Sequence, residues 1–337
     1  MRLRLLRIAF VVLPVGALLA LKWRSSAGAI SRAVAGGDLA ARSGPLSADG
    51  LGAIAAPIVE TANYLAIVWP ALVLGLLIAA GVRAFLPARA LARILDGGAA
   101  KQQLVAGLAG APLMLCSCCV APVFTSVYGR TRRLGPALGL MIGSPALNPA
   151  ALILTFVLFS AAASIGRLAM ALVAVLVASA VIGRLFGASA APPDSTGAEE
   201  EAPATAADTF RSFGRSLAGV ALRTVPLIVL GVIASVAIAR ALPVDWLAST
   251  EGKVATIAVV SLVAVPLALP TFFEIPLALA LLAAGAPAGA AAALLFAGPA
   301  INLPSLFTVA RSSSWRAAAA LGAAVWLIAF AGGVAVG

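Results

Sequence analysis

Long apolar stretches constrain the fold of this chain more than any other feature. A helix that spans a lipid bilayer needs about 20 mostly apolar residues. The stretches that approach or exceed this length are residues 5–21, 58–82, 104–127, 134–159, 165–186, 217–241, 254–284, 288–309 and 317–336. Only 10% of the 337 residues are charged, against about 25% in soluble domains. The sequence therefore predicts an all-α polytopic membrane protein and excludes an ordinary cytosolic enzyme.

Basic residues give the expected orientation. The formal net charge is +11, and the cations lie singly or in short clusters between the apolar stretches. This pattern indicates topology-setting charge and contact with anionic lipid, and not nucleic-acid binding. Arg2, Arg4 and Arg7 precede the first stretch and predict a cytoplasmic N-terminus. The rival interpretation is a signal peptide cleaved near residues 27–29, but the polar residues 22–24 before that site favour an uncleaved anchor helix.

The segment 104–127 is flanked by basic residues on both sides. They are Arg83, Arg89, Arg93 and Lys101 before it and Arg130, Arg132 and Arg133 after it. If both clusters are cytoplasmic, the segment enters and leaves on the same side, and it is too short for two spans. We therefore predict a re-entrant hairpin, with one ordinary span as the alternative. Residues 84–95 alternate apolar and basic side chains and are expected to lie at the membrane interface.

An internal repeat appears when the sequence is shifted by 154 residues. Pro112, Pro122, Pro145 and Asn148 then fall on Pro266, Pro276, Pro299 and Asn302. The sequence predicts two copies of one unit, residues 58–186 and 217–337, joined by a flexible cytoplasmic linker at 187–216. An anchor helix and a polar connection, residues 1–57, precede them. With an odd number of spans in each copy the repeats are inverted, as in many secondary transporters. Four spans in each copy would make the repeats parallel.

The three cysteines of the chain lie within four residues, at Cys116, Cys118 and Cys119, between Pro112 and Pro122. Prolines disrupt helix, and irregular backbone at membrane depth is tolerated only where it is buried or lines a cavity. Thiolates select soft, thiophilic species such as monovalent copper or trivalent arsenic. A structural zinc site would need four ligands. The alternative is that the cysteines only allow close helix packing, as small apolar residues do.

Two further motifs interrupt apolar stretches near their middle, at residues 143–149 and 298–304. Half-helix N-termini that follow such breaks carry partial positive charge, which suits anions. We predict that the motifs form a gate or a binding element, with Ser144, Asn148 and Asn302 as substrate-binding candidates. The alternative is a pair of kinked helices whose asparagines form interhelical hydrogen bonds. The predicted helix breaks are Pro112, Pro122, Pro145, Pro149, Pro270, Pro276, Pro299 and Pro304.

Glu274 lies deep within an apolar stretch, where a charge is costly, so its side chain is expected to face the protein interior. It occupies the repeat position of Val120, beside the cysteines of the first copy. This placement makes Glu274 a proton-coupling candidate. The alternative is a buried, protonated carboxyl that only makes structural hydrogen bonds.

These motifs resemble a predicted-permease family that includes bacterial efflux permeases for trivalent organoarsenicals and relatives proposed to export heavy metals. The resemblance rests on residues 116–118 with Pro122 and on residues 144–149, more weakly on Glu274 and residues 298–299, and covers most of 58–336. It implies an inner-membrane efflux permease in which the two cysteines of 116–118, Cys116 and Cys118, bind the thiophilic substrate or metal. Many relatives have glycine at the position of Cys119.

The leading hypothesis is a secondary transporter that exports a thiophilic solute and is not an enzyme. Its expected partners are the lipid bilayer and the small substrate; neither a cofactor nor nucleic acid is expected, and homo-oligomerisation stays open. The sequence contains no ATP-binding motif of the form G-x-x-x-x-G-K-[ST]. This argues against an intrinsic ATP-driven pump. The alternative is a membrane-embedded thiol redox enzyme or sensor, because Cys116 and Cys119 have Cys-x-x-Cys spacing. A non-transporting scaffold would leave the doubled breaks unexplained.

Overall fold

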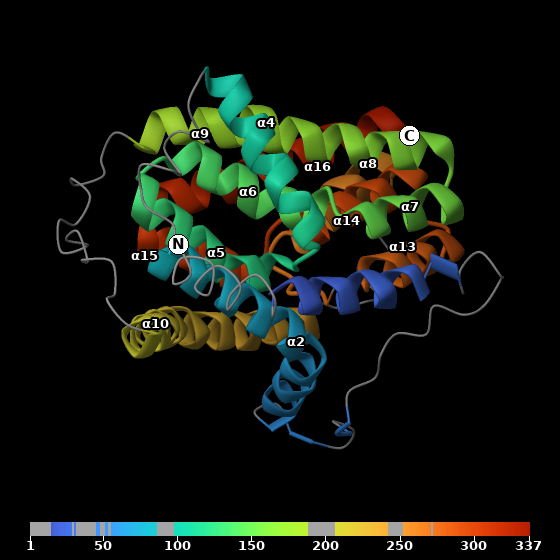
Figure 1. The fold of residues 1–337 in the computed structure, drawn as a ribbon. Helices are drawn as coiled ribbons and strands as arrows, with labels where there is room; N and C mark the ends of the chain where they lie inside the picture. Colours follow the sequence, from blue (N-terminus) through green and yellow to red (C-terminus); the bar gives the residue numbers. More distant parts are fainter. Residues whose placement is uncertain are drawn as a thin grey trace.

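The computed structural model describes residues 15–28, 30–31, 45–47, 51–52, 55–85, 98–187, 206–241, 252–270 and 272–337. Within these ranges every regular element is a helix (Figure 1). The elements are α2 (Ala55–Phe85), α4 (Ala99–Gly110), η1 (Ala111–Leu113), α5 (Ser117–Thr131), α6 (Leu134–Ala146), α7 (Pro149–Leu158), α8 (Ala161–Val173), η2 (Ala174–Ala178), α9 (Ser179–Phe186), α10 (Ala206–Ala241), α12 (Lys253–Ala264), α13 (Glu274–Ala283), α14 (Ala288–Ala300), α15 (Leu303–Ser312) and α16 (Trp315–Val336). The basic residues 2–7, most of the interfacial segment 84–95 and the linker residues 188–205 lie outside the described ranges.

The described helices confirm an all-α polytopic membrane protein. Four of them are long and apolar enough to cross a bilayer: α2, the continuous run α8–η2–α9, α10 and α16. Two helix pairs, α6 with α7 and α14 with α15, are each bent at a short break, by 44° and 45°. If each bent pair counts as one span, the described residues contain up to six spans. The bends fall at the two motifs that the sequence predicts as breaks.

Three sequence predictions need correction. The stretch 254–284 is not one element, because α12 ends at Ala264 and α13 begins only at Glu274. The predicted linker 187–216 ends early, since α10 already begins at Ala206. Pro122 and Pro276 do not break helices: each lies inside one, at the sixth residue of α5 and the third of α13. A proline in the first turn removes an N–H that has no helical partner anyway, and packing in membrane proteins tolerates one deeper in a helix.

The order of elements repeats along the chain. A long helix with an internal proline comes first in each half, α2 with Pro70 and α10 with Pro226. Among the described residues, two shorter α-helices follow in each half, with the short η1 between them in the first. A bent pair comes next, then a long apolar run: α8–η2–α9 in the first half and α16 in the second. This series matches the repeat that the sequence suggests. The inverted relation of the two copies stays a prediction.

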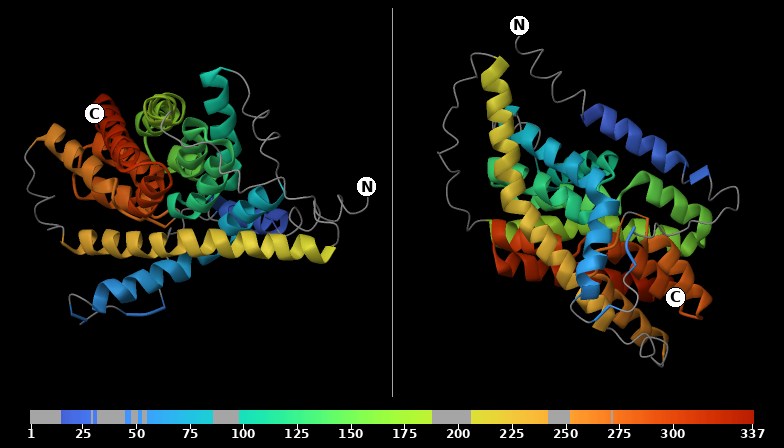
Figure 2. Two further views of the ribbon diagram at one scale, coloured as in Figure 1. Left: turned by 90° about the vertical axis from the view of Figure 1, so that its left-hand side faces the viewer. Right: turned by 90° about the horizontal axis from the view of Figure 1, so that it is seen from below.

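The helices form a core between two outer faces (Figures 1 and 2). α2 and α10 lie side by side on one face, where they contact α5 and α15. α4, α8 and α9 lie toward the opposite face. α14 lies between them and contacts α6, α8, α12, α13 and α16. Its residues 289–298 are all buried, and most are Ala or Gly, so neighbouring backbones come close on every side.

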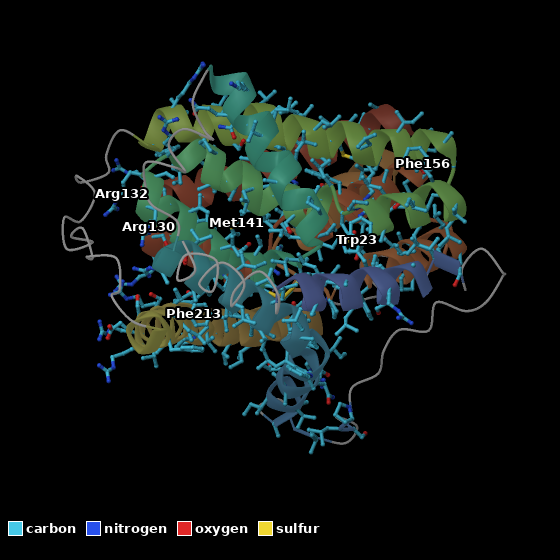
Figure 3. All side chains as sticks on the ribbon, viewed as in Figure 1. Trp23, Arg130, Arg132, Met141, Phe156 and Phe213 are labelled. Atoms are coloured by element: carbon cyan, nitrogen blue, oxygen red, sulfur yellow. A yellow bond between two sulfur atoms is a disulfide. The ribbon has the colours of Figure 1, made fainter. Side chains whose placement is uncertain are left out.

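Basic side chains of three helices meet at one end of the molecule. Arg83 near the end of α2 lies within electrostatic range of Arg130 and Arg223, and Arg130 donates a hydrogen bond to the Arg83 carbonyl. Figure 3 shows Arg130 and Arg132 together at this end, far from Phe156 on α7. Arg83 and Arg130, which flank the segment 104–127, thus lie together, as a re-entrant hairpin requires. The hairpin itself stays a prediction.

A very close helix crossing involves Gly75 of α2. A Cβ atom at this position would overlap the carbonyl oxygen of Cys119, so the backbones of α2 and α5 are in direct contact. The opposed glycines Gly135 and Gly183 bring α6 and α9 together in the same way. Small residues at crossings are typical of membrane helix packing, where close approach provides the van der Waals contact.

We expect Gly75→Ala to lower the stability of the protein by about 1–3 kcal/mol, the usual effect of overpacking. A thermal unfolding curve in detergent, read by tryptophan fluorescence, measures the change. Gly219→Ala in α10 is the matched control, because a Cβ there meets no atom within 4 Å. It should leave the protein equally or more stable. An unchanged melting temperature for Gly75→Ala would show that α2 and α5 are not in contact there.

Candidate functional site

The cysteine loop, residues 114–119, consists of the connection from η1 to α5 and the first three residues of α5. Pro112 lies in η1, Met114 adopts a left-handed backbone conformation (φ 48°), and α5 begins at Ser117 with Cys116 as its N-cap. Ser144 of α6 fixes the loop, because its hydroxyl accepts a hydrogen bond from the Leu115 amide (3.1 Å). The hydroxyl satisfies a backbone group that lipid could not. Ser144 therefore shapes the loop, and the cavity described below is formed by other side chains.

The loop brings all three sulfur atoms together. Cys116 and Cys119 form a disulfide, and the Cys118 Sγ lies 3.3 Å from the Cys116 Sγ and 3.7 Å from the Cys119 Sγ. All three residues are buried. On a regular helix Cys118 would point away from the other two, but the extended backbone of Cys116 (ψ 160°) places its sulfur beside Cys118. The three sulfur atoms lie within 4.8 Å of one another, and reduction of the disulfide would supply three thiols, which are soft ligands.

Two residues that the sequence pattern did not single out surround Cys118. The hydroxyl of Tyr64 in α2 lies 3.1 Å from the Cys118 Sγ and is buried. Lys22, in the N-terminal helical residues 15–28, lies within electrostatic range of the same sulfur. The neighbouring Trp23 donates its indole N–H to the Pro112 carbonyl (3.3 Å). Tyr64 is one of only two tyrosines in the chain, and that rarity inside an apolar stretch is the signal that could have identified it.

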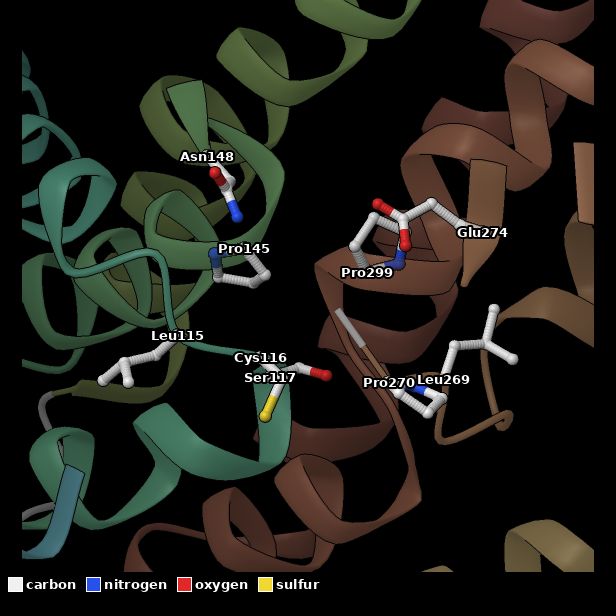
Figure 4. Close-up of a pocket in the computed structure, with 9 residues that line it drawn as sticks. All are labelled: Leu115, Cys116, Ser117, Pro145, Asn148, Leu269, Pro270, Glu274 and Pro299. Carbon is white, nitrogen blue, oxygen red and sulfur yellow. The ribbon is translucent and has the colours of Figure 1, made fainter. Parts of the chain in front are cut away.

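A cavity separates the cysteine loop from Leu269, Pro270, Glu274 and Pro299 in the second half of the chain (Figure 4). Its lining comes from the starts of α5, α7 and α13 and from the breaks beside them. The lining residues are Leu115, Cys116, Ser117, Pro145, Asn148, Leu269, Pro270, Glu274 and Pro299. In the close-up, the Glu274 carboxyl and the Ser117 hydroxyl extend toward the gap from opposite sides. The cavity therefore has one wall from the first half of the chain that includes the disulfide-bonded Cys116 and an acidic wall from the second half.

A buried ion pair between Arg167 and Glu274 lies behind the acidic wall of the cavity. Arg167 Nη2 of α8 lies 3.3 Å from Glu274 Oε1, and the two side chains are 0% and 3% exposed. Arg167 Nη1 also donates to the hydroxyl of Thr155 in α7, while its Nε is buried without a hydrogen-bond partner. A buried charge needs such a counter-charge. Sequence reasoning did not identify Arg167, although a lone arginine within an apolar stretch is a functional signal of the same kind as Glu274.

The two asparagines hold the bends, but only one lines the cavity. Asn148 accepts hydrogen bonds from the amides of Ala150 (3.0 Å) and Ala151 (3.4 Å) and caps α7. The Asn302 side-chain oxygen caps α15 by accepting from the backbone N–H of Ser305 (3.1 Å). In return, the Ser305 hydroxyl accepts from the backbone N–H of Asn302. Asn148 lies in the cavity wall. Asn302 is not among the lining residues, and its Nδ2 is buried without a partner.

The predicted site residues thus separate into three groups. Cys116, Asn148 and Glu274 line one cavity. Cys118 and Cys119 lie directly behind it in the sulfur cluster. Ser144 and Asn302, in contrast, accept hydrogen bonds from backbone amides and do not line the cavity.

Comparison with known proteins identifies the family. A family model described as "Predicted permease" (ArsP_1) matches residues 55–337, so the N-terminal helical residues that approach the cysteine loop precede the matched segment. The UPF0718 protein YraQ of Escherichia coli (strain K12) is 30% identical over 268 residues, which cover 78% of this chain and 75% of that protein. No solved structure matches the chain. The protein therefore belongs to this family of predicted permeases, and its class is that of a membrane transporter.

Proposed function

We propose that this protein is a secondary transporter of the inner (plasma) membrane that exports a small thiophilic solute, such as a trivalent organoarsenical or a heavy-metal species. One observation carries the proposal: a single cavity between the two repeats is lined by both Cys116 and Glu274. A soft ligand and a carboxyl on facing walls suit a substrate that binds sulfur and moves with a proton. Binding at a repeat interface beside broken helices is the common arrangement in secondary transporters.

In this proposal the thiols hold the substrate while it crosses the membrane. The Cys116–Cys119 disulfide must first be reduced, a step in which a cellular dithiol gives up two electrons and two protons. Each thiol that then binds a trivalent arsenical replaces one hydroxyl on arsenic, and the thiol proton leaves with that hydroxyl as water. Cys116 and Cys118 are the proposed ligands, with Cys119 beside them as a third sulfur.

Glu274 is the proposed coupling group. It lines the cavity and is paired with Arg167, so gain of a proton by the carboxyl would break the ion pair that joins α8 to α13. A charge change at a helix interface is a direct way to favour one packing of the two repeats over another. We further propose a cytoplasmic N-terminus, on the basis of the N-terminal arginines. The expected partners are the lipid bilayer and the transported solute.

A second candidate function is supported by the disulfide itself. Cys116 and Cys119 are joined in a Cys-x-x-Cys arrangement at the start of α5, which is the position that lowers a thiol's affinity for its proton in redox proteins. A membrane-embedded thiol redox enzyme or sensor would use this pair and would not require Cys118. The two functions thus assign the three cysteines differently.

We expect Cys118→Ser and the Cys116→Ser/Cys118→Ser double variant to reduce accumulation of trivalent methylarsenite in everted membrane vesicles at least tenfold. Cys119→Ser should keep most of the activity, because Cys116 and Cys118 remain. Vesicles are assayed with and without a proton gradient, with monovalent copper and an unrelated solute in parallel. A reductant that contains no thiol is present, so that no added sulfur competes with the cysteines for the substrate. If Cys119→Ser is inactive and Cys118→Ser is active, the redox function is favoured and the ligand assignment is wrong.

Glu274→Gln should abolish stimulation of uptake by the proton gradient, because an amide cannot take up the proton. Uptake in energised vesicles should fall to the level seen without a gradient, and the protein should remain in the membrane. Glu60→Gln is the control, since Glu60 pairs with Arg240 outside the cavity and is partly exposed. Gradient-stimulated uptake by Glu274→Gln equal to that of the unmodified protein would remove Glu274 from the coupling mechanism.

Asn148 has two roles, because it caps α7 and also lines the cavity. Two substitutions separate these roles. Asn148→Ser keeps a capping oxygen and should leave stability nearly unchanged while raising the KM for transport. Asn148→Ala loses the cap as well and should lower stability by about 1 kcal/mol. Thermal unfolding and initial uptake rates measure the two effects. An unchanged KM for Asn148→Ser would leave Asn148 as a cap alone.

A further inference from the structure

Three helices begin at the wall of the cavity. α5 starts at Ser117, α7 starts after its N-cap Asn148, and α13 starts at Glu274, and all three of these residues line the cavity. Each helix has at least ten residues. The unpaired N–H groups of a helix start carry a partial positive charge. Asn148 caps the α7 start by accepting from the Ala150 and Ala151 amides, whereas the α5 and α13 starts have no side-chain cap. These two starts make the electrostatic potential of the cavity positive, unless other groups compensate.

The side-chain charges near the cavity do not compensate for this potential. Glu274 is the one acidic residue in the lining, and its carboxylate is already neutralised by Arg167 at 3.3 Å. The guanidinium is fully buried, and its Nε has no hydrogen-bond partner. A buried donor without a partner is costly. The guanidinium therefore retains capacity to bind a second acceptor. Arg167 is not among the lining residues, so the Glu274 carboxylate separates the guanidinium from the cavity, and a ligand reaches it only when that carboxylate moves.

We infer that the transported species carries an anionic group beside its thiophilic atom, and that Arg167 is the residue that binds this group. This inference rests on the proposed function and adds the charge of the substrate to it. The thiophilic atom binds at the wall that carries Cys116, and the anionic group takes the place of the Glu274 carboxylate against Arg167. Carboxylates and small oxyanions fit, because a guanidinium offers parallel N–H donors that match two oxygen atoms.

The ion pair then acts as an exchange site. In the empty cavity Glu274 satisfies Arg167. When the carboxylate turns away or is protonated, the substrate anion replaces it, and the buried guanidinium keeps a counter-charge throughout. Among the described residues, the hydroxyl of Thr155 and the Glu274 carboxylate are the partners that hold the guanidinium, and Thr155 remains in place during the exchange.

The test compares phenylarsine oxide with 4-carboxyphenylarsine oxide. Both compounds are trivalent and thiophilic, and only the second carries a carboxylate. Dissociation constants are measured by isothermal titration calorimetry on the reduced, purified full-length protein. Uptake of phenylarsine oxide into everted vesicles is measured in parallel, because it reports on the proposed function without the anionic group.

The unmodified protein should bind the carboxylated compound about tenfold or more tightly than the neutral one, the usual effect of a hydrogen-bonded charge. Glu274→Gln removes the competing carboxylate and should enlarge this preference. The Arg167→Gln/Glu274→Gln double variant leaves no unpaired buried charge, so it should fold, and it should lose the preference entirely. Arg184→Gln, at an exposed arginine near the end of the same helical run, should match the unmodified protein.

Two results would overturn the inference: equal affinity of the unmodified protein for both compounds, or a preference that survives in the double variant. If phenylarsine oxide is bound and transported in either case, the proposed function stands and only the anionic group is wrong. If neither compound is bound or transported, the proposed function fails, and this inference fails with it.

Discussion

Lipid offers no hydrogen bonds, and the whole arrangement depends on how the chain satisfies its backbone where helices break. Each break has its own solution. Ser144 bonds the amide of the cysteine loop, Asn148 caps α7, and Asn302 with Ser305 caps α15. These polar side chains make interrupted helices stable inside an apolar core. Residues at interruptions in both halves of the chain line the same cavity, so the cavity lies where these interruptions come together.

The apolar stretches and prolines predicted much of this fold. The lengths of α2 and α16 and the bends beside Pro145 and Pro299 follow from local pattern, because a proline or a run of apolar residues acts on its own segment. The boundary of α10 and the break between α12 and α13 did not follow. Residues 206–216 are polar enough to suggest a linker, and 254–284 are uniformly apolar, so packing and not local preference decides both.

The candidate site was predicted only in part, for a related reason. Cys116, Asn148 and Glu274 stand out in the sequence because they are unusual within apolar stretches, and all three line the cavity. Arg167 and Tyr64 are equally unusual, but their roles depend on partners more than 50 residues away. The positions of Ser144 and Asn302 show the converse limit. A motif identifies a polar residue at a break, but it does not say whether that residue faces the backbone or the cavity.

The contact between Gly75 and the Cys119 carbonyl has a mechanical consequence. At Gly75 no side chain separates α2 from the start of α5, so a shift of Cys119 toward α2 has to move α2 as well. α2 packs along α10, and α10 packs on α15, which begins at the second break. The break before α5 and the break before α15 are therefore connected through α2 and α10, which are in direct contact. A movement of the sulfur cluster is transmitted along these helices to the Asn302 cap. The long helices serve as the linkage between the two halves as well as their anchors in the membrane.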